Sequence, residues 1–190
     1  MPTGSVLALT DAQSAAGYDF TVDLTLDENP GVMMISFKLD YDKDALEFLG
    51  GEDGALTGWY FSDTGAVWDA SSDRTETGCL AKLNFHVKDG ADTGRTEIYI
   101  TDLFTGNFNE ESLIVDPVSS TVNIVQRVGG DVNSDGSVNG FDLLRLRKHL
   151  AGLDVEYSLV NSDVNGDGVV DLLDLVRLRK HLAGVNVDLG

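Results

Sequence analysis

Cysteine, proline and basic residues are scarce in this chain, and each scarcity excludes something. The single cysteine, Cys79, cannot form an intramolecular disulfide, so no disulfide framework holds the fold. With only three prolines, the chain has no long Pro-rich linker. No apolar run approaches the roughly 20 residues that a membrane-spanning helix needs. Only 13 Lys and Arg residues balance 32 Asp and Glu residues, which argues against a nucleic-acid partner because phosphate binding requires basic patches.

Recognisable catalytic motifs are missing as well. The sequence has no Gly-x-Ser-x-Gly motif, no phosphate-binding loop and no zinc-type spacing, and its three histidines are His86, His149 and His181. Acidic pairs are abundant, but abundance alone does not make a general acid–base site. The sequence therefore predicts a protein that is not an enzyme.

What the chain does contain is a stretch that occurs twice towards its C-terminal end. The first copy, DVNSDGSVNGFD, begins at Asp131, and the second, DVNGDGVVDLLD, begins 32 residues later at Asp163. Both copies run into a leucine-rich segment that contains LRKHLAG. Repetition at a fixed offset indicates a duplicated structural unit.

Each copy has the spacing of an EF-hand calcium loop, with oxygen-bearing side chains at positions 1, 3, 5, 9 and 12 and glycine at position 6. Position 7 contributes its carbonyl, so its side chain is free to vary. One departure is Asp in place of Glu at position 12. The alternative is a pair of Asp/Asn/Gly turns that cap helices. The predicted ligands of two Ca²⁺ ions are Asp131, Asn133, Asp135, Ser137, Asn139 and Asp142 in the first loop, and Asp163, Asn165, Asp167, Val169, Asp171 and Asp174 in the second.

A helix is expected after each loop, because leucines there recur at i, i+3 and i+7. These leucines form the predicted buried seam: Leu143, Leu146 and Leu150, then Leu175, Leu178 and Leu182. The Arg and Lys residues of both segments lie off that seam.

Residues 128–184 resemble the dockerin module of cellulosomes, because each loop has an exiting helix but little room for an entering one. The resemblance implies two bound Ca²⁺ ions and binding to a partner module called cohesin. The repeated Arg-Lys pair leaves two binding orientations open, whereas the differing Gly-Phe and Leu-Leu pairs favour one. A solvated helix face remains the alternative for the basic residues. The recognition positions of the family correspond to Gly140, Phe141, Arg147, Lys148, Leu172, Leu173, Arg179 and Lys180.

The segment before the repeat is predicted to be all-β. Apolar and polar residues alternate over short stretches separated by turn residues, which is typical of a sandwich. Residues 50–58 are predicted to be a glycine-rich loop, and Cys79 a buried small hydrophobe. Strands are expected at residues 18–26, 33–41, 46–49, 59–62, 66–70, 79–87, 96–101 and 121–126.

Stretches 28–48, 77–90 and, more loosely, 97–102 resemble the cohesin module itself. The resemblance implies a jelly-roll sandwich whose one flat sheet face receives a dockerin. Met34, Ser36 and Lys38 match that face, although they could instead form only the solvent side of a half-buried sheet. The chain is thus predicted to have two modules: a cohesin-like sandwich at 5–127 and a small α-helical, dockerin-like module with duplicated F-hand calcium loops at 128–190.

Together the two resemblances predict an adaptor scaffoldin of a polysaccharide-degrading complex. Its sandwich would bind a dockerin-bearing protein, and its dockerin would bind a cohesin on another scaffoldin; head-to-tail self-association is left open. The main alternative is a carbohydrate-binding sandwich whose aromatic platform would come from Trp59, Tyr60, Phe61 and Trp68, but the core is the favoured place for the two tryptophans. A small hydrolase is a third hypothesis. Calcium loops suit the extracellular milieu. We therefore expect secretion, although no secretory leader is recognisable at the N-terminus.

Overall fold

The computed structural model describes residues 7–112 and 118–190, and the chain divides after Val125 into two compact units. Residues 5 and 6, with which the predicted sandwich begins, and residues 113–117 within it lie outside the described residues. Each unit is described by itself.

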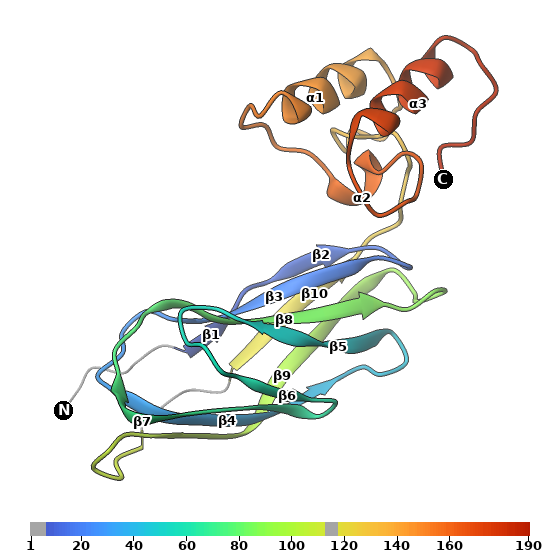
Figure 1. Ribbon diagram of the computed structural model, residues 1–190. Coiled ribbons are helices and arrows are strands. Elements are labelled where there is room, and N and C mark those ends of the chain that lie inside the picture. Colours follow the sequence, from blue (N-terminus) through green and yellow to red (C-terminus); the bar gives the residue numbers. More distant parts are fainter. Residues whose placement is uncertain (1–6, 113–117) are drawn as a thin grey trace. The chain divides into compact units, whose positions relative to one another are not determined.

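The N-terminal unit is a sandwich of two sheets (Figure 1). Its pairs are antiparallel, apart from a parallel pair between β2 and β10. The four-stranded sheet has the order β1 (Leu7–Leu9), β3 (Asp19–Leu26), β8 (Gly78–Val87), β5 (Leu46–Asp53). The six-stranded sheet has the order β2 (Ala12–Ser14), β10 (Val118–Ile124), β9 (Gly94–Gly106), β4 (Val32–Tyr41), β7 (Gly65–Arg74), β6 (Tyr60–Ser62).

The alternation of the strands buries one apolar face of each sheet, which confirms the predicted β-sandwich. Ile35, Phe37 and Leu39 of β4 point into the core, whereas Met34, Lys38 and Asp40 point outward. Because successive side chains of a strand alternate between faces, this pattern fixes which row of each strand faces solvent.

The structure differs from the sequence prediction in β5, which continues through Gly50 and Gly51 instead of ending before a loop. A register shift between Phe48 and Gly50 marks a bulge, and Gly50 has a φ of 109°. A Cβ on Gly51 would lie 2.6 Å from the Lys82 carbonyl oxygen, so glycine is what lets the two strands approach there. The loop prediction is therefore wrong for the first four residues of 50–58.

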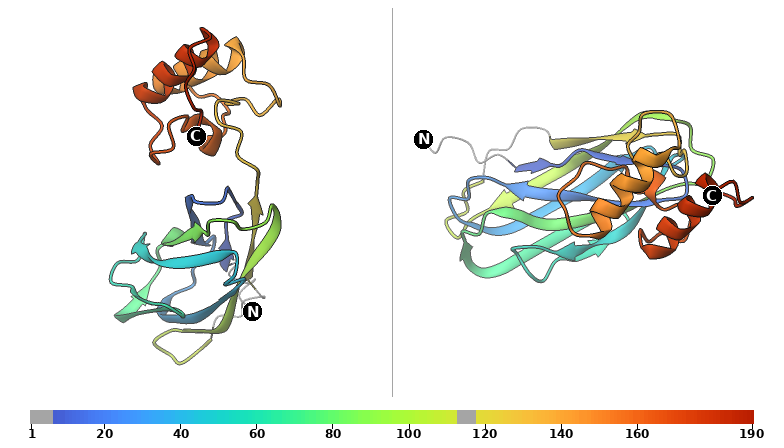
Figure 2. Two further views of the ribbon diagram at one scale, coloured as in Figure 1. Left: turned by 90° about the vertical axis from the view of Figure 1, so that its right-hand side faces the viewer. Right: turned by 90° about the horizontal axis from the view of Figure 1, so that it is seen from above.

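The C-terminal unit contains α1 (Gly140–Leu150), the short α2 (Leu159–Ser162) and α3 (Leu172–Leu182), with α1 and α3 beside one another in both views (Figure 2). Its small core is built by Val132, Leu146, Val164 and Leu178, which are fully buried. The other seam leucines pack against that core, as the leucine spacing predicts. No helix among the described residues is long and apolar enough to cross a membrane.

Candidate functional site

The first loop of the repeat folds around the side chain of its first residue. Oδ1 and Oδ2 of Asp131 accept hydrogen bonds from the backbone N–H groups of Asp135 (3.1 Å) and Gly136 (3.0 Å). Gly136 has a φ of 86°, a left-handed conformation that favours glycine and makes this tight turn accessible. The loop backbone is thus wrapped around one carboxylate.

The last residue of the loop, Asp142, closes it from the opposite end. Its Oδ1 accepts a hydrogen bond from the Asn133 N–H at 3.0 Å, and its Oδ2 accepts one from the Asn139 N–H at 2.8 Å. Asn139 is also the N-cap of α1, and its side chain accepts a hydrogen bond from the Phe141 N–H. Positions 9 and 12 therefore form a capping box and begin the helix, as the helix-cap alternative predicts.

The second loop repeats this arrangement. Asp163 accepts hydrogen bonds from the N–H groups of Asp167 (3.1 Å) and Gly168 (2.9 Å). Asp174 accepts hydrogen bonds from the N–H groups of Asn165 (3.0 Å) and Asp171 (2.7 Å). Asp171 caps α3 as Asn139 caps α1. The sequence repeat is thus a repeat of structure, down to individual hydrogen bonds.

Turn and cap roles do not account for the burial of the first and last residues of each loop. Asp131, Asp142, Asp163 and Asp174 are between 0% and 3% exposed. None of the ion pairs found between described residues involves Asp131, Asp142 or Asp174. A buried carboxylate is costly unless it is both hydrogen-bonded and balanced by a cation. For Asp131, Asp142 and Asp174, the described residues supply hydrogen bonds but no ion pair. The oxygen donor set and its excess negative charge therefore fit a hard divalent cation.

The remaining predicted ligands lie on the rim of the loops. Asn133 Nδ2 donates to Asp135 Oδ2 at 2.8 Å, and Asn165 Nδ2 donates to Asp167 Oδ2 at 2.7 Å, so positions 3 and 5 are joined in both loops. Ser137 and Val169 at position 7 are exposed, as expected of residues that offer only a carbonyl. Within the described ranges, no three His, Cys, Asp or Glu side chains gather into a ready-made metal cluster. The loops are organised mainly by backbone N–H groups.

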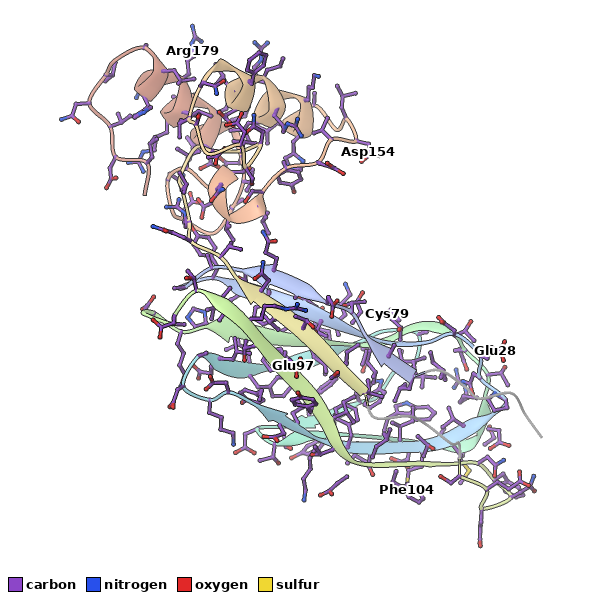
Figure 3. The ribbon with its side chains drawn as sticks, turned by 180° about the vertical axis from the view of Figure 1, so that it is seen from behind. Glu28, Cys79, Glu97, Phe104, Asp154 and Arg179 are labelled. Carbon is purple, nitrogen blue, oxygen red and sulfur yellow. The ribbon has the colours of Figure 1, made fainter. Side chains whose placement is uncertain are left out.

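The helices after the loops expose apolar side chains on the side away from the core. Phe141 is 71% exposed on α1, and Leu173 is 61% exposed at the equivalent position of α3. One turn later, Leu144 and Val176 are also exposed; the sequence prediction missed both, although their i+3 spacing from Phe141 and Leu173 is the signal that identifies them. Figure 3 shows Arg179 at the outer surface of α3. The other predicted recognition residues are exposed too: Gly140, Arg147, Lys148, Leu172 and Lys180.

The outer faces of the two sheets differ in character. On the four-stranded sheet the outward residues are mainly polar, with Thr21 hydrogen-bonded to Asn84 at 2.9 Å and His86 beside Asp19 at 2.6 Å, and Leu49 of β5 is its exposed large apolar residue. On the six-stranded sheet a register row crosses four strands. It consists of Tyr60, Val67, Ser36 and Phe104, which we call the aromatic row.

The aromatic row is largely exposed. Tyr60 is 73% and Phe104 is 51% exposed, and Figure 3 shows Phe104 on the side of the sheet away from the core. Met34 lies next to the row on β4, and Lys38 on the other side pairs with Asp102 at 2.7 Å. The sequence prediction thus placed Met34, Ser36 and Lys38 on one face but missed the aromatic partners that neighbouring strands supply.

A shallow cavity of about 410 Å³ lies at one end of this face. Met33, Met34 and Phe104 form its apolar part, and Glu110 and Glu111 supply acidic groups. Such a surface suits a partner that presents an apolar side chain next to a basic one.

The tryptophans of the proposed sugar platform are core residues. Trp59 and Trp68 are buried, and their Nε1–H groups donate to the carbonyl oxygens of Leu80 and Thr57, both at 3.1 Å. Phe61 is half-buried and stacks on Trp59, which leaves Tyr60 as the exposed member of the predicted cluster.

Cys79 is half-buried, not fully buried as its strand pattern predicts. Burial raises the pKa of its thiol, which disfavours the reactive thiolate.

Two family models match the chain in succession. Residues 5–124, more than half of the chain, match the cohesin domain, and residues 129–183 match the dockerin type I domain. No curated protein matches the chain.

Several solved structures share the fold at low sequence identity. A non-cellulosomal cohesin from the hyperthermophilic archaeon Archaeoglobus fulgidus has a TM-score of 0.56 at 19% identity, covering 65% of this chain and 93% of its own. The seventh ScaB type I cohesin from Pseudobacteroides cellulosolvens has a TM-score of 0.55 at 19% identity, covering 66% and 96%. A chain of a type I cohesin–dockerin complex from Clostridium thermocellum has a TM-score of 0.57 at 11% identity, covering 65% and 100%.

Proposed function

The chain belongs to the cohesin domain family, and on that premise we propose that it is a non-catalytic adaptor scaffoldin with two binding ends. The cohesin-like module predicted at residues 5–127 binds a dockerin-bearing enzyme or other protein. The dockerin-like module predicted at residues 128–190 binds a cohesin on another scaffoldin. The observation that carries this proposal is the succession of a cohesin domain and a dockerin type I domain in one short chain.

The difference between the two sheet faces supports a protein-binding role for the sandwich. An exposed apolar row on one face, with a polar face opposite, is the pattern of an interaction surface. The aromatic row and Met34 supply large apolar contact area, and methionine adapts to the shape of a partner. Lys38, held beside Asp102, contributes polar contact at the edge of the same surface. We assign dockerin binding to this face.

The loops support calcium dependence of the second binding end. The twelve predicted residues would hold two Ca²⁺ ions, one in each loop, and the ions would neutralise the buried carboxylates. Residues 128–190 carry 10 acidic and 6 basic residues, a net charge of −4, so two divalent cations bring this unit to about zero. The exposed Arg-Lys pairs and apolar residues of α1 and α3 then form the surface offered to a cohesin.

This role fits a protein that acts outside the cell in a polysaccharide-degrading complex, where calcium is abundant. The related structures include a type I cohesin–dockerin complex and a cohesin described as non-cellulosomal, so the polysaccharide-degrading context is part of the proposal and separate from the binding role.

Binding assays on the full chain separate the adaptor from a carbohydrate-binding protein. Immobilised chain is expected to retain dockerin-bearing proteins from a cellulolytic secretome and to leave insoluble polysaccharide unbound. Retention of polysaccharide, with no dockerin captured, would favour the carbohydrate-binding alternative. Sedimentation of the chain alone over a range of concentrations tests the self-associated form, which would appear as concentration-dependent oligomers.

A further inference from the structure

Different side chains hydrogen-bond to the backbone carbonyl of the first residue in each proposed calcium loop. In the first loop, the side-chain amide of Asn161 donates from Nδ2 to the carbonyl oxygen of Asp131 at 3.0 Å, in a buried hydrogen bond. The other groups of Asn161 hold the segment before the loop: Oδ1 accepts from the Val128 N–H at 2.9 Å, and the carbonyl accepts from the Gly130 N–H at 2.8 Å. A neutral amide thus fixes the backbone of the first ligand residue.

In the second loop, the corresponding support comes from an arginine. Arg127 donates from Nε to the Val160 carbonyl oxygen at 3.0 Å and from Nη2 to the carbonyl oxygen of Asp163. Asp163 has the same place in the second loop that Asp131 has in the first. The planar guanidinium therefore bonds to one carbonyl within the short helix α2 and to the carbonyl of the residue that follows α2.

Packing explains why the 32-residue repeat breaks at this point. The repeat equivalent of Asn161 is Gly129, which has no side chain to support the second loop. A Cβ at Gly129 would lie 1.8 Å from the Leu189 carbonyl oxygen, so no larger residue fits there. The repeat equivalent of Arg127 is Leu159, which is exposed. The first residue of the second loop is thus supported by an arginine, whereas that of the first loop is supported by an asparagine amide.

From this asymmetry we infer that Arg127 is a positioning residue for the second calcium loop and couples cation binding there to the order of residues 127–130, which lie at the start of the C-terminal unit and which we call the junction. The inference rests on the proposed calcium loops. Groups that hydrogen-bond to a ligand residue raise metal affinity, because they fix the position of that residue before the ion binds. Since Arg127, Val128 and Gly130 all bond to residues 160–163, a cation that orders the second loop also orders the junction.

Calorimetric titration of the full chain with Ca²⁺ tests the first half of this inference. In an Asp131→Ala background, which disables the first loop, Arg127→Ala is expected to weaken binding at the second loop roughly tenfold or more. In an Asp163→Ala background, the same substitution should leave binding at the first loop unchanged. Arg127→Lys, which keeps the charge but lacks the fork, should behave like Arg127→Ala if positioning is the cause.

Amide hydrogen exchange tests the second half. With calcium, the Val128 and Gly130 amides of the wild-type chain should be protected, and Arg127→Ala should remove most of that protection. Arg145→Ala is the matched control: Arg145 is half-buried in the same unit and donates to the Glu156 carbonyl oxygen at 2.6 Å, away from both loops.

Two failures are distinguishable. If the wild-type chain binds no Ca²⁺, the proposed calcium loops are wrong. If it binds two ions and Arg127→Ala leaves the second site and the junction protection unchanged, only the role of Arg127 is wrong.

Discussion

Glycine at the sixth position of each loop is a conformational requirement of the turn. Gly136 and Gly168 have φ values of 86° and 85°, and no atom lies within 4 Å of a Cβ built on either residue. A side chain would therefore have room at these positions. It would cost free energy because a residue with a Cβ disfavours the left-handed backbone conformation. Gly136→Ala is expected to lower the free energy of unfolding of the C-terminal unit by about 1–2 kcal/mol, measured by urea denaturation followed by helical circular dichroism.

Gly140→Ala is the matched control for that prediction. Gly140 begins α1, it is absent from the positive-φ glycines, and its Cβ position is also open. Alanine there should be neutral or stabilise the helix by up to about 1 kcal/mol. Equal losses for both variants would contradict the conformational explanation.

At this scale the spacing of side-chain types predicted where the two loops lie, and the assignment of their residues as calcium ligands stays a prediction. The structure shows turn and cap hydrogen bonds for these residues, as the helix-cap alternative predicts. The support from Arg127 could not be predicted, because it depends on a fold that brings residues 127 and 160–163 together.

Each long helix of the C-terminal unit depends on the loop before it. Asn139 and Asp171 are at once loop residues and N-caps, and each helix has only 11 residues. A helix of that length is marginal in water on its own. Removing calcium with a chelator is therefore expected to lower the helical signal strongly while the β-sheet signal of the sandwich persists.

Two substitutions distinguish loss of calcium binding by the loop from general destabilisation of the C-terminal unit. Asp142→Ala removes both a predicted ligand and half of the capping box, and it should reproduce the effect of the chelator on α1. Asp154→Ala, which changes an exposed residue between the helices, should leave the calcium response intact. Full helicity in the chelator would refute the calcium assignment.

A second prediction at this scale concerns the aromatic row of the six-stranded sheet. Tyr60→Ala combined with Phe104→Ala removes both rings of the aromatic row and should weaken dockerin binding tenfold or more, since aromatic residues that become buried dominate interface energies. Surface plasmon resonance with an immobilised dockerin measures the change. Thr21→Ala, on the outer face of the other sheet, is the control. Equal effects from the two faces would refute the assignment of the binding surface.

Strands with long, regular alternation, such as β4 and β8, were predicted, and so was the short β6, whereas β1 and β2 were missed. β1 and β2 have three residues each and pair with β3 and β10, which the sequence pattern of the short strands does not show. The aromatic row could not be read from one strand, because its members come from β6, β7, β4 and β9 and meet only through register.

On the scale of the whole chain, the segments before and after the predicted module boundary at residue 127 differ in charge. Residues 1–127 carry 22 acidic and 7 basic residues, a net charge of −15, whereas residues 128–190 carry −4 before any cation binds. The acidic sandwich favours partners with basic surfaces, and we expect the dockerin-like unit, when neutralised by calcium, to bind through its local Arg-Lys pairs and apolar residues. The two ends should therefore select different partners.

Because of that difference, substitutions should be able to abolish each of the two binding interactions of the proposed adaptor separately. A cohesin partner, the full chain and a dockerin-bearing partner should sediment together as a ternary complex in calcium. The combined change Asp131→Ala and Asp163→Ala disables both loops of this chain but leaves its sandwich intact, because the ligands lie in a separate compact unit. The variant should lose the cohesin partner and keep the dockerin-bearing one, whereas the aromatic-row variant should do the reverse. Loss of both partners in either variant would mean that the two units do not act as independent binding ends.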